Sequence, residues 1–168
     1  VAARAPITYD YAVKNHCNIM SWPFTRPFAE AELYKQRLDD ALESSSNGFK
    51  PIFAMMRHAA VYTNKEEANV YIKAIQRILG QFENLYRNLG DVKDGFPKEI
   101  ALKELENRDE YNPNMLEENL LFGTPDDVIK KLKLYEDLGV DNFIYYASMG
   151  LDHASQKRSL KLFCEEVL

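Results

Sequence analysis

The stretch FGTPDDVIKKLKLYEDLGVDNFIYYASMG, residues 122–150, contains a complete helix followed by a strand. Thr124 is a typical N-cap residue, Pro125 suits the first helical position, and acidic residues fill the first turn. Apolar residues then recur at helical spacing until Gly139, a typical helix terminator. These apolar positions are Val128, Ile129, Leu132, Tyr135 and Leu138. The run VDNFIYYA, residues 140–147, predicts a strand, so the whole stretch is a helix-to-strand unit.

The rest of the chain repeats this alternation. Strands are expected at residues 1–3, 17–22 and 51–62, and helices at 6–14, 28–42, about 65–86 and 155–167. Four strands that alternate with helices predict an α/β fold with a parallel sheet and right-handed crossovers. Half of a TIM-like (β/α)₈ barrel has this content. The sequence carries no glycine fingerprint of the dinucleotide-binding kind, which disfavours a doubly wound nucleotide fold.

Residues 88–119 form the least regular part of the sequence. This segment carries many charges together with Gly90, Gly95, Pro97 and Pro113. We expect it to be an irregular insertion that shapes the mouth of a substrate site or acts as a mobile lid. Residues 1–168 are otherwise expected to form a single partial domain.

Composition and charge exclude several classes of partner. The 168 residues are 46% hydrophobic and 28% charged, with a net charge of −5 and no lysine or arginine run. This balance argues against nucleic acid or an anionic membrane surface as a partner. No apolar run approaches the ~18–20 residues that a membrane span requires. Cys17 and Cys164 have no metal or redox spacing, which indicates reduced thiols and a cytoplasmic location.

The junction Arg4-Ala5-Pro6-Ile7-Thr8 is the first candidate site. A strand ends there, an arginine follows, and a helix begins with Pro6. Free N–H groups at a helix N-terminus favour an anion, and Arg4 and Thr8 can add charge-assisted hydrogen bonds. In a parallel α/β fold this junction lies on the functional face. The pattern indicates a phosphate site; the alternative is a solvated arginine beside an ordinary helix start.

Two further candidates follow the same logic. Ser21 and Trp22 end the next strand on the same face, where Trp22 can form the wall of a pocket for a flat ligand or simply pack there. Arg57 and His58 lie within an otherwise apolar strand, where a buried charge is costly without a partner. His58 is a candidate general base or ligand contact, and a hydrogen-bonded core histidine is the alternative.

The sequence has no constellation for covalent or metal catalysis. No His, Asp or Glu cluster has metal-ligand spacing, and no serine or cysteine elbow suggests a nucleophile. No metal site is therefore expected. If the protein is an enzyme, a cofactor supplies the difficult chemistry.

The chain resembles the bacterial luciferase-like flavin-dependent monooxygenases. The similarity is carried by VAARAPITYDYAVKNHCNIMSW at residues 1–22, YTNKEEA at 62–68, the opening stretch at 122–150, and SLKLFCEEVL at 159–168. In that family a Gly-Thr/Ser-Pro-x-x-Val/Ile helix runs into a Gly-Val/Ile-Asp/Ser strand. The resemblance covers nearly the whole of this chain. The matching residues correspond to only the C-terminal half of the family's sequences, so the chain is expected to be a fragment.

The resemblance implies the C-terminal half of a (β/α)₈ barrel in an enzyme that oxygenates a small organic substrate. Reduced FMN would come from a separate flavin reductase, with O₂ as co-substrate. The family's flavin phosphate lies at the junction matched here by Arg4, Ala5 and Thr8, and the strand end matched by Ser21 and Trp22 lies near the flavin. Luciferase itself has an acidic residue and a serine where Arg4 and Ala5 stand.

Two other functions remain open within the same resemblance. One is an F420-dependent oxidoreductase that transfers hydride, and the other is a non-catalytic flavin-binding or partner subunit. A half-barrel exposes two sheet edges, here residues 1–3 and 143–147, so we expect a homodimer or pairing with a further half.

Overall fold

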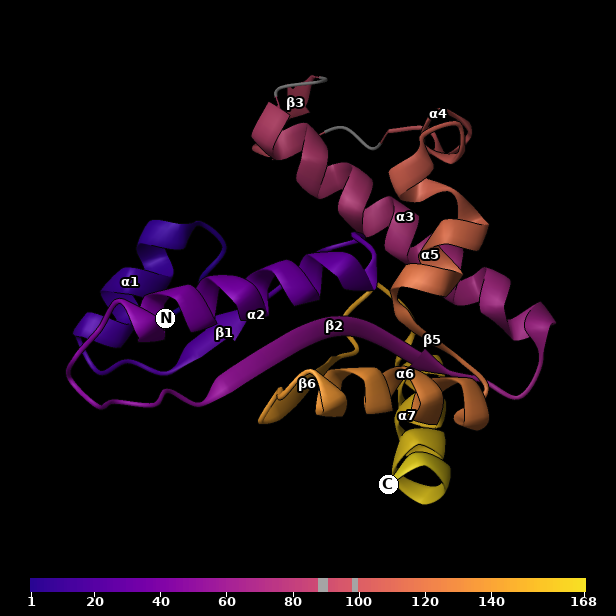
Figure 1. Cartoon of the computed structure of the whole chain (residues 1–168). Helices are drawn as coiled ribbons and strands as arrows, with labels where there is room; N and C mark the ends of the chain where they lie inside the picture. The colour runs from indigo at the N-terminus through magenta and orange to yellow at the C-terminus, as the bar shows by residue number, and fades with distance from the viewer. Residues whose placement is uncertain (88–90, 98–99) are drawn as a thin grey trace.

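The computed structural model describes residues 1–87, 91–97 and 100–168 (Figure 1). The helices are α1 (Pro6–Lys14), α2 (Phe28–Glu43), α3 (Lys65–Arg87), α4 (Leu102–Glu106), α5 (Pro113–Asn119), α6 (Pro125–Asp137) and α7 (His153–Leu162). A 3₁₀ turn, η1 (Asp109–Tyr111), and a π-helical turn, η2 (Phe163–Val167), complete the helical segments. The strands are β1 (Ile19–Ser21), β2 (Phe53–Val61), β3 (Val92–Lys93), β4 (Phe96–Pro97), β5 (Leu121–Gly123) and β6 (Asn142–Tyr146).

Strand β2 is the centre of the main sheet. It pairs in parallel with β1 from Phe53 to Met55, with β6 from Ala54 to His58, and with β5 from Ala59 to Val61. Ala2 adds an isolated parallel bridge to Met20 on the outer side of β1. The expected α/β fold, with parallel strands that alternate with helices, is confirmed. The strands do not close into a barrel within the described residues.

Helices cover the sheet on both sides. Figure 1 shows α6 and α7 on the opposite side of β2 from α3. One hydrophobic cluster joins α1 and α2 to the first half of β2, a second joins α3 to α4 and α5, and a third joins β5 to α6 and η2. The sheet is therefore buried between these layers near its centre. No helix in the described ranges is both long and apolar enough to cross a membrane.

Two details differ from the sequence analysis. β5 was not expected, because three residues are too few for a periodic pattern and Leu121 and Phe122 also fit a helical stripe. The expected strand at residues 1–3 is reduced to the single bridge at Ala2.

The segment 88–119 contains the β3–β4 hairpin, α4, η1 and the whole of α5. Residues 88–90 and 98–99 of this expected insertion or lid lie outside the described residues.

The start of α6 confirms the predicted cap. The Thr124 hydroxyl accepts the Asp127 N–H, and the Asp127 carboxylate accepts the hydroxyl of Thr124 at 2.7 Å and its N–H at 3.3 Å. Pro125 occupies the first turn, and Gly139 follows the helix with a φ of +85°. Reciprocal capping of this kind satisfies backbone donors that the helix itself leaves unpaired.

Gly123→Ala is expected to disturb this cap. Gly123 has a φ of +156°, and an added Cβ would lie 2.6 Å from the Asp127 Cβ. We expect the free energy of unfolding to fall by about 3 kcal/mol, since backbone strain and a steric clash act together. Gly48→Ala is the matched control, because Gly48 has a φ of +71° and open space around it. Equal losses for the two variants in urea unfolding would contradict the account.

Candidate functional site

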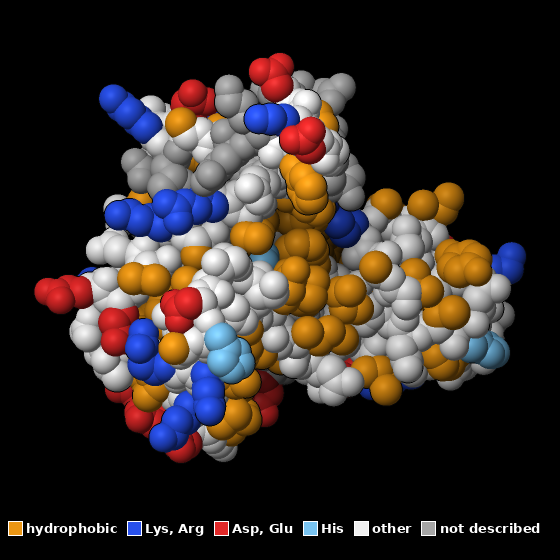
Figure 2. Space-filling model, turned by 180° about the vertical axis from the view of Figure 1, so that it is seen from behind, with side chains coloured by type: hydrophobic (Ala, Val, Ile, Leu, Met, Phe, Trp, Pro, Cys, Tyr) orange, Lys and Arg blue, Asp and Glu red, His pale blue; other side chains and the backbone are white. Residues whose placement is uncertain are grey.

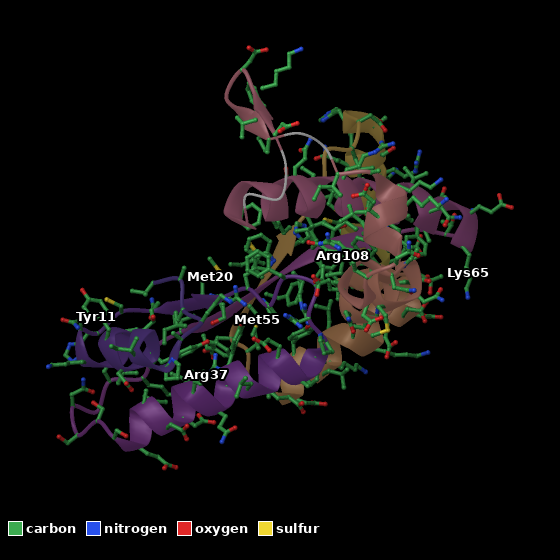
Figure 3. All side chains as sticks on the ribbon, turned by 90° about the horizontal axis from the view of Figure 1, so that it is seen from above. Tyr11, Met20, Arg37, Met55, Lys65 and Arg108 are labelled. Atoms are coloured by element: carbon green, nitrogen blue, oxygen red, sulfur yellow. The ribbon has the colours of Figure 1, made fainter. Side chains whose placement is uncertain are left out.

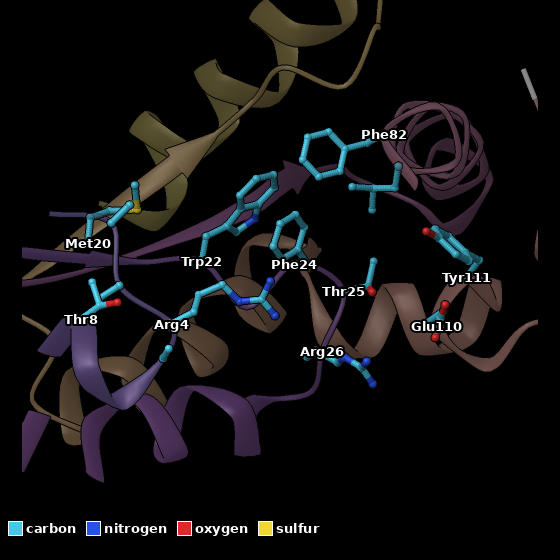
Figure 4. A pocket seen from close by; sticks show the side chains of 14 residues that line it. Arg4, Thr8, Met20, Trp22, Phe24, Thr25, Arg26, Phe82, Glu110 and Tyr111 are labelled. Atoms are coloured by element: carbon cyan, nitrogen blue, oxygen red, sulfur yellow. The ribbon is translucent and has the colours of Figure 1, made fainter. Parts of the chain in front are cut away.

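A cleft of about 710 Å³ lies at the carboxyl ends of the first strands. On the face drawn in Figure 2, hydrophobic side chains gather around a hollow in the middle of the molecule. The cleft residues come from the start of the chain, the β1–α2 connection, α3 and η1 (Figure 4). They are Ala2, Ala3, Arg4, Ala5, Thr8, Met20, Trp22, Phe24, Thr25, Arg26, Leu79, Phe82, Glu110 and Tyr111. Ligands of parallel α/β folds bind at this end of the strands.

Arg4 is anchored at one end of the cleft. Its Nε donates to the Tyr34 hydroxyl at 3.0 Å, and its guanidinium carbon lies 4.8 Å from the centre of the Phe24 ring. Arg37 donates to the Arg4 carbonyl and holds the backbone. Burial raises the pKa of Tyr34, so the hydroxyl stays neutral and accepts from Arg4. Because Nε is engaged, the two terminal nitrogens of Arg4 are the ones placed to meet a ligand.

The first turn of α1 supplies further donors next to Arg4. Ala5 is the N-cap residue and provides no side-chain cap, and Pro6 has no N–H. The Thr8 N–H donates to the Ala5 carbonyl at 2.9 Å. The helix therefore leaves the Ile7 N–H without an intrahelical acceptor, and the Thr8 hydroxyl lies beside the cleft. Together with Arg4, this donor set suits an anion.

An aromatic wall, formed by Trp22, Phe24 and Phe82, borders the cleft next to Arg4 (Figure 4). The Trp22 and Phe24 rings are stacked with centroids 4.0 Å apart and an interplanar angle of 25°. Phe82 lies 5.7 Å from Phe24 and 6.3 Å from Trp22. Phe24 has a φ of +55°, a rare backbone conformation for a bulky residue. The wall offers a flat apolar surface to a planar ligand.

Ser21 is not among the cleft residues. Its hydroxyl donates to the Ala3 carbonyl at 2.9 Å and lies 2.7 Å from the Tyr9 hydroxyl, fully buried. Burial raises the pKa of Tyr9 to about 12. Ser21 therefore ties the strand end at Ala3 to α1, beneath the cleft. Of the candidate site residues, Arg4, Ala5, Thr8 and Trp22 line the cleft, and Ser21 and His58 do not.

His58 lies fully buried behind Trp22. Its ring is stacked on Tyr146 at a centroid distance of 4.5 Å and meets Trp22 edge-on at 5.4 Å. Within the described residues neither ring nitrogen has a hydrogen-bond partner. Burial, and to a smaller extent the charge of Arg57, lowers the pKa of His58 to about 3. His58 is therefore a neutral support for Trp22 and a poor proton acceptor at neutral pH.

The buried neutral state of His58 predicts an acid-sensitive fold. The unfolded chain binds a proton at His58 below its ordinary pKa of 6.5, whereas the folded chain does so only near 3. Stability is therefore lost as the pH falls from 6.5 towards 3, by about 2 kcal/mol at pH 5. His58→Phe should remove this part of the loss in urea unfolding at pH 7 and pH 5. His153→Gln, at an exposed histidine, should leave the loss of stability at pH 5 unchanged. Equal pH profiles of stability for wild type and His58→Phe would refute the assignment of this loss to His58.

Several cleft residues escaped the sequence analysis. Phe24 and Thr25 lie beyond the end of the expected strand at 17–22 and before the expected helix at 28–42, where no element was predicted. Phe82 comes from α3, and Tyr111 from η1, more than 50 residues further along the chain. No local pattern marks such residues, because only the packing of α3 over the strand ends brings them to the cleft. In the described part of the chain no group of three His, Cys, Asp or Glu residues could hold a metal ion.

Comparison with known proteins gives one curated relative. The oxygenase component of a flavin-dependent trigonelline monooxygenase from Acinetobacter baylyi is 26% identical over all 168 residues. The chain spans about half of this relative, 47% of its length. No family model matches the sequence.

Solved structures share the fold. The oxygenating constituent of the 3,6-diketocamphane monooxygenase of Pseudomonas putida, a type II Baeyer–Villiger enzyme solved with FMN, has a TM-score of 0.66 at 15% identity. Monooxygenase RslO1 from Streptomyces bottropensis has a TM-score of 0.61 at 20% identity. Each match covers 99% of this chain and 46% of the other. Together with the curated relative, they confirm the expected resemblance to flavin-dependent monooxygenases.

Proposed function

We propose that this chain is the phosphate-binding half of an FMN-dependent monooxygenase, which uses reduced FMN and O₂ to oxygenate a small organic substrate. The observation that carries the proposal is the cleft, where Arg4 and the first turn of α1 adjoin the aromatic wall. FMN carries both an anionic group, its phosphate, and a flat ring, its isoalloxazine, joined by a ribityl chain. The named activity of the curated relative and the FMN in the diketocamphane enzyme support the same ligand.

The phosphate end is assigned to Arg4, Ala5 and Thr8. The Tyr34 hydroxyl fixes the Arg4 guanidinium through Nε, which leaves its terminal nitrogens for phosphate oxygens. The Ile7 N–H and the Thr8 hydroxyl supply donors from the helix start, whose dipole favours an anion. Charge-assisted contacts of this kind bind phosphate strongly.

The ring end is assigned to the aromatic wall, with Trp22 as its principal residue. Bound reduced flavin supplies two electrons, so that one oxygen atom of O₂ enters the substrate and the other leaves as water. The residues of this chain bind and orient the flavin, and the wall excludes water from it. We assign no proton transfer to His58 for two reasons: burial lowers its pKa and keeps the ring neutral, and His58 is not among the residues that line the cleft. Its proposed part is to support Trp22.

The sheet supports the proposal of a half-barrel. Ala2, β1, β2 and β6 follow one another across the sheet in chain order, each parallel to the next, and the short strand β5 adds a parallel pair at the far end of β2. A doubly wound sheet reverses its strand order near the middle, whereas a (β/α)₈ barrel does not. We therefore propose that residues 1–168 are one partial domain, the C-terminal half of a barrel in a longer protein. The edges at Ala2 and β6 would receive the strands of the other half.

The segment 88–119 is proposed to cover the cleft as a lid. Glu110 and Tyr111 of η1 contribute to the cleft lining, and the Gln76 amide of α3 donates to the Tyr111 carbonyl at 2.7 Å. The contact with α3 therefore holds η1 of this segment at the edge of the cleft. The name "oxygenase component" of the relative supports a separate flavin reductase as a partner. A homodimer and a cytoplasmic location remain predictions.

Anaerobic titration of the intact protein with reduced FMN and with reduced F420 tests the proposal. We expect reduced FMN to bind and F420 not to bind, and an oxygenated product to form when air, NADH, a flavin reductase and a suitable small organic substrate are supplied. Binding of F420 alone would identify a hydride-transfer oxidoreductase. Flavin binding without turnover on any of a panel of small organic substrates would indicate a non-catalytic flavin-binding subunit.

A further inference from the structure

Arg57 is a fully buried arginine in the middle of β2. Its Nε donates to the Tyr135 hydroxyl at 2.6 Å, and its Nη1 donates to the carbonyls of Phe24 at 3.1 Å and Arg26 at 2.8 Å. Its guanidinium carbon lies 5.8 Å from the centre of the Tyr135 ring. One arginine thus connects the central strand, helix α6 and the β1–α2 connection.

The partners of Arg57 are neutral oxygens. The acceptors recorded for it in the described ranges are one hydroxyl and two carbonyls, and its Nη2 has no partner there. Burial of a charge without a carboxylate is costly, and an apolar residue of similar volume often stabilises a core as well or better. Stability therefore gives no reason for an arginine at this position. The guanidinium instead fixes the positions of the Phe24 and Arg26 carbonyls.

These two carbonyls belong to the turn at residues 23–26, which positions Phe24 of the aromatic wall. Phe24 has a φ of +55°, a conformation that costs free energy unless surrounding contacts hold it. In this conformation the Phe24 ring stacks on Trp22 at 4.0 Å and contacts the guanidinium of Arg4. A turn released from Arg57 can relax to an ordinary backbone conformation, which would move the Phe24 ring away from Trp22.

We propose that Arg57 is a positioning residue that builds the aromatic wall of the cleft. It touches no ligand and acts through the backbone of residues 24–26. Tyr135 orients the guanidinium by accepting from Nε, and so links the wall to α6. The effect on flavin rests on the proposed function, whereas the effect on the wall does not.

The single tryptophan of the chain, Trp22, reports on the wall without any ligand. In Arg57→Met we expect Trp22 emission to shift to longer wavelength and its quenching by acrylamide to rise at least twofold. Asn47→Ala is the control, because the Asn47 amide also holds a backbone carbonyl, that of Val13 at 2.9 Å, near the end of α1 that lies away from the cleft. It should lower the stability and leave Trp22 emission and quenching unchanged.

Two milder variants keep the test decisive if Arg57→Met does not fold. Tyr135→Phe removes one acceptor and should change Trp22 quenching in the same direction by a smaller amount. Arg57→Lys keeps the charge but lacks the Nε that donates to the Tyr135 hydroxyl, so its Trp22 quenching should fall between wild type and Arg57→Met. Unchanged quenching in Tyr135→Phe, or an equal change in Asn47→Ala, would overturn the proposal.

Flavin binding then separates this proposal from the proposed function. In the intact protein, Arg57→Met should weaken FMN and riboflavin by the same factor, about five- to tenfold, because the wall contacts the ring rather than the phosphate. A selective loss of FMN would assign Arg57 to the phosphate site and contradict its role in the wall. If the wild type binds neither flavin, the proposed function fails, and the tryptophan result still decides the role of Arg57.

Discussion

Arg4→Ala is expected to weaken FMN binding by the intact protein about 10- to 150-fold and to leave riboflavin binding nearly unchanged. A charge-assisted hydrogen bond contributes about 1.5–3 kcal/mol, which corresponds to this range of dissociation constants. The selectivity follows from geometry: the Arg4 guanidinium is anchored on Tyr34 beside the start of α1, where a phosphate can meet it. Titration of protein fluorescence with the two flavins gives both constants.

Lys65→Ala provides the matched control for Arg4→Ala. It removes the same unit of positive charge, and Figure 3 shows Lys65 at one end of the molecule, well away from Met20, which lines the cleft. Both flavins should bind this variant as they bind the wild type. Equal losses of FMN and riboflavin in Arg4→Ala would mean that Arg4 supports the wall through Phe24 and does not bind phosphate.

Trp22→Ala is expected to weaken both flavins by a similar factor, from about 5- to 150-fold. Stacking of a flat ring on an aromatic side chain contributes about 1–3 kcal/mol, and phosphate plays no part in it. Trp22 also covers His58 and stacks on Phe24, so the substitution removes the largest part of the wall. Equilibrium dialysis with FMN and riboflavin measures the two losses.

Trp22→Phe distinguishes a lost aromatic surface from a damaged fold. A phenyl ring keeps the stack on Phe24 and should retain most of the affinity for both flavins. Thermal unfolding of each variant shows how much of the loss reflects stability. If Trp22→Ala binds FMN as tightly as the wild type, the wall is not the ring site.

Local signals in the sequence predicted the parts of the fold that local contacts determine. The Thr124 cap and the Gly139 terminator bound α6 because hydrogen bonds within a few residues decide a helix end. The parallel order followed from the alternation of strands and helices. β5 was missed because its three residues gain their strand conformation from pairing with β2, which no local pattern records.

The candidate site likewise has features that the sequence predicted and features that it did not. Arg4, Ala5 and Thr8 were predictable, since strand end, arginine and helix start are adjacent in the sequence. The partner of Arg4 was not, because Tyr34 reaches it from α2, 30 residues away. Arg57 was recognised as a costly buried charge, but its acceptors are backbone carbonyls, and no residue type in the sequence reveals a carbonyl's position.

Charge illustrates the difference between the whole chain and the site. The net charge of −5 argues against polyanionic partners, and the cleft nevertheless has Arg4 and Arg26 in its lining. A single phosphate requires one well-held guanidinium and a few N–H or O–H donors, not a basic surface. The overall charge therefore argues against nucleic acid as a partner and is compatible with a phosphorylated cofactor.

A structure of the intact protein with bound FMN tests the central claim most directly. The account predicts the phosphate within hydrogen-bonding distance of the Arg4 terminal nitrogens and of the Thr8 hydroxyl, with the flavin ring against Trp22. A phosphate bound elsewhere, with Arg4 still on Tyr34 and facing solvent, would contradict it.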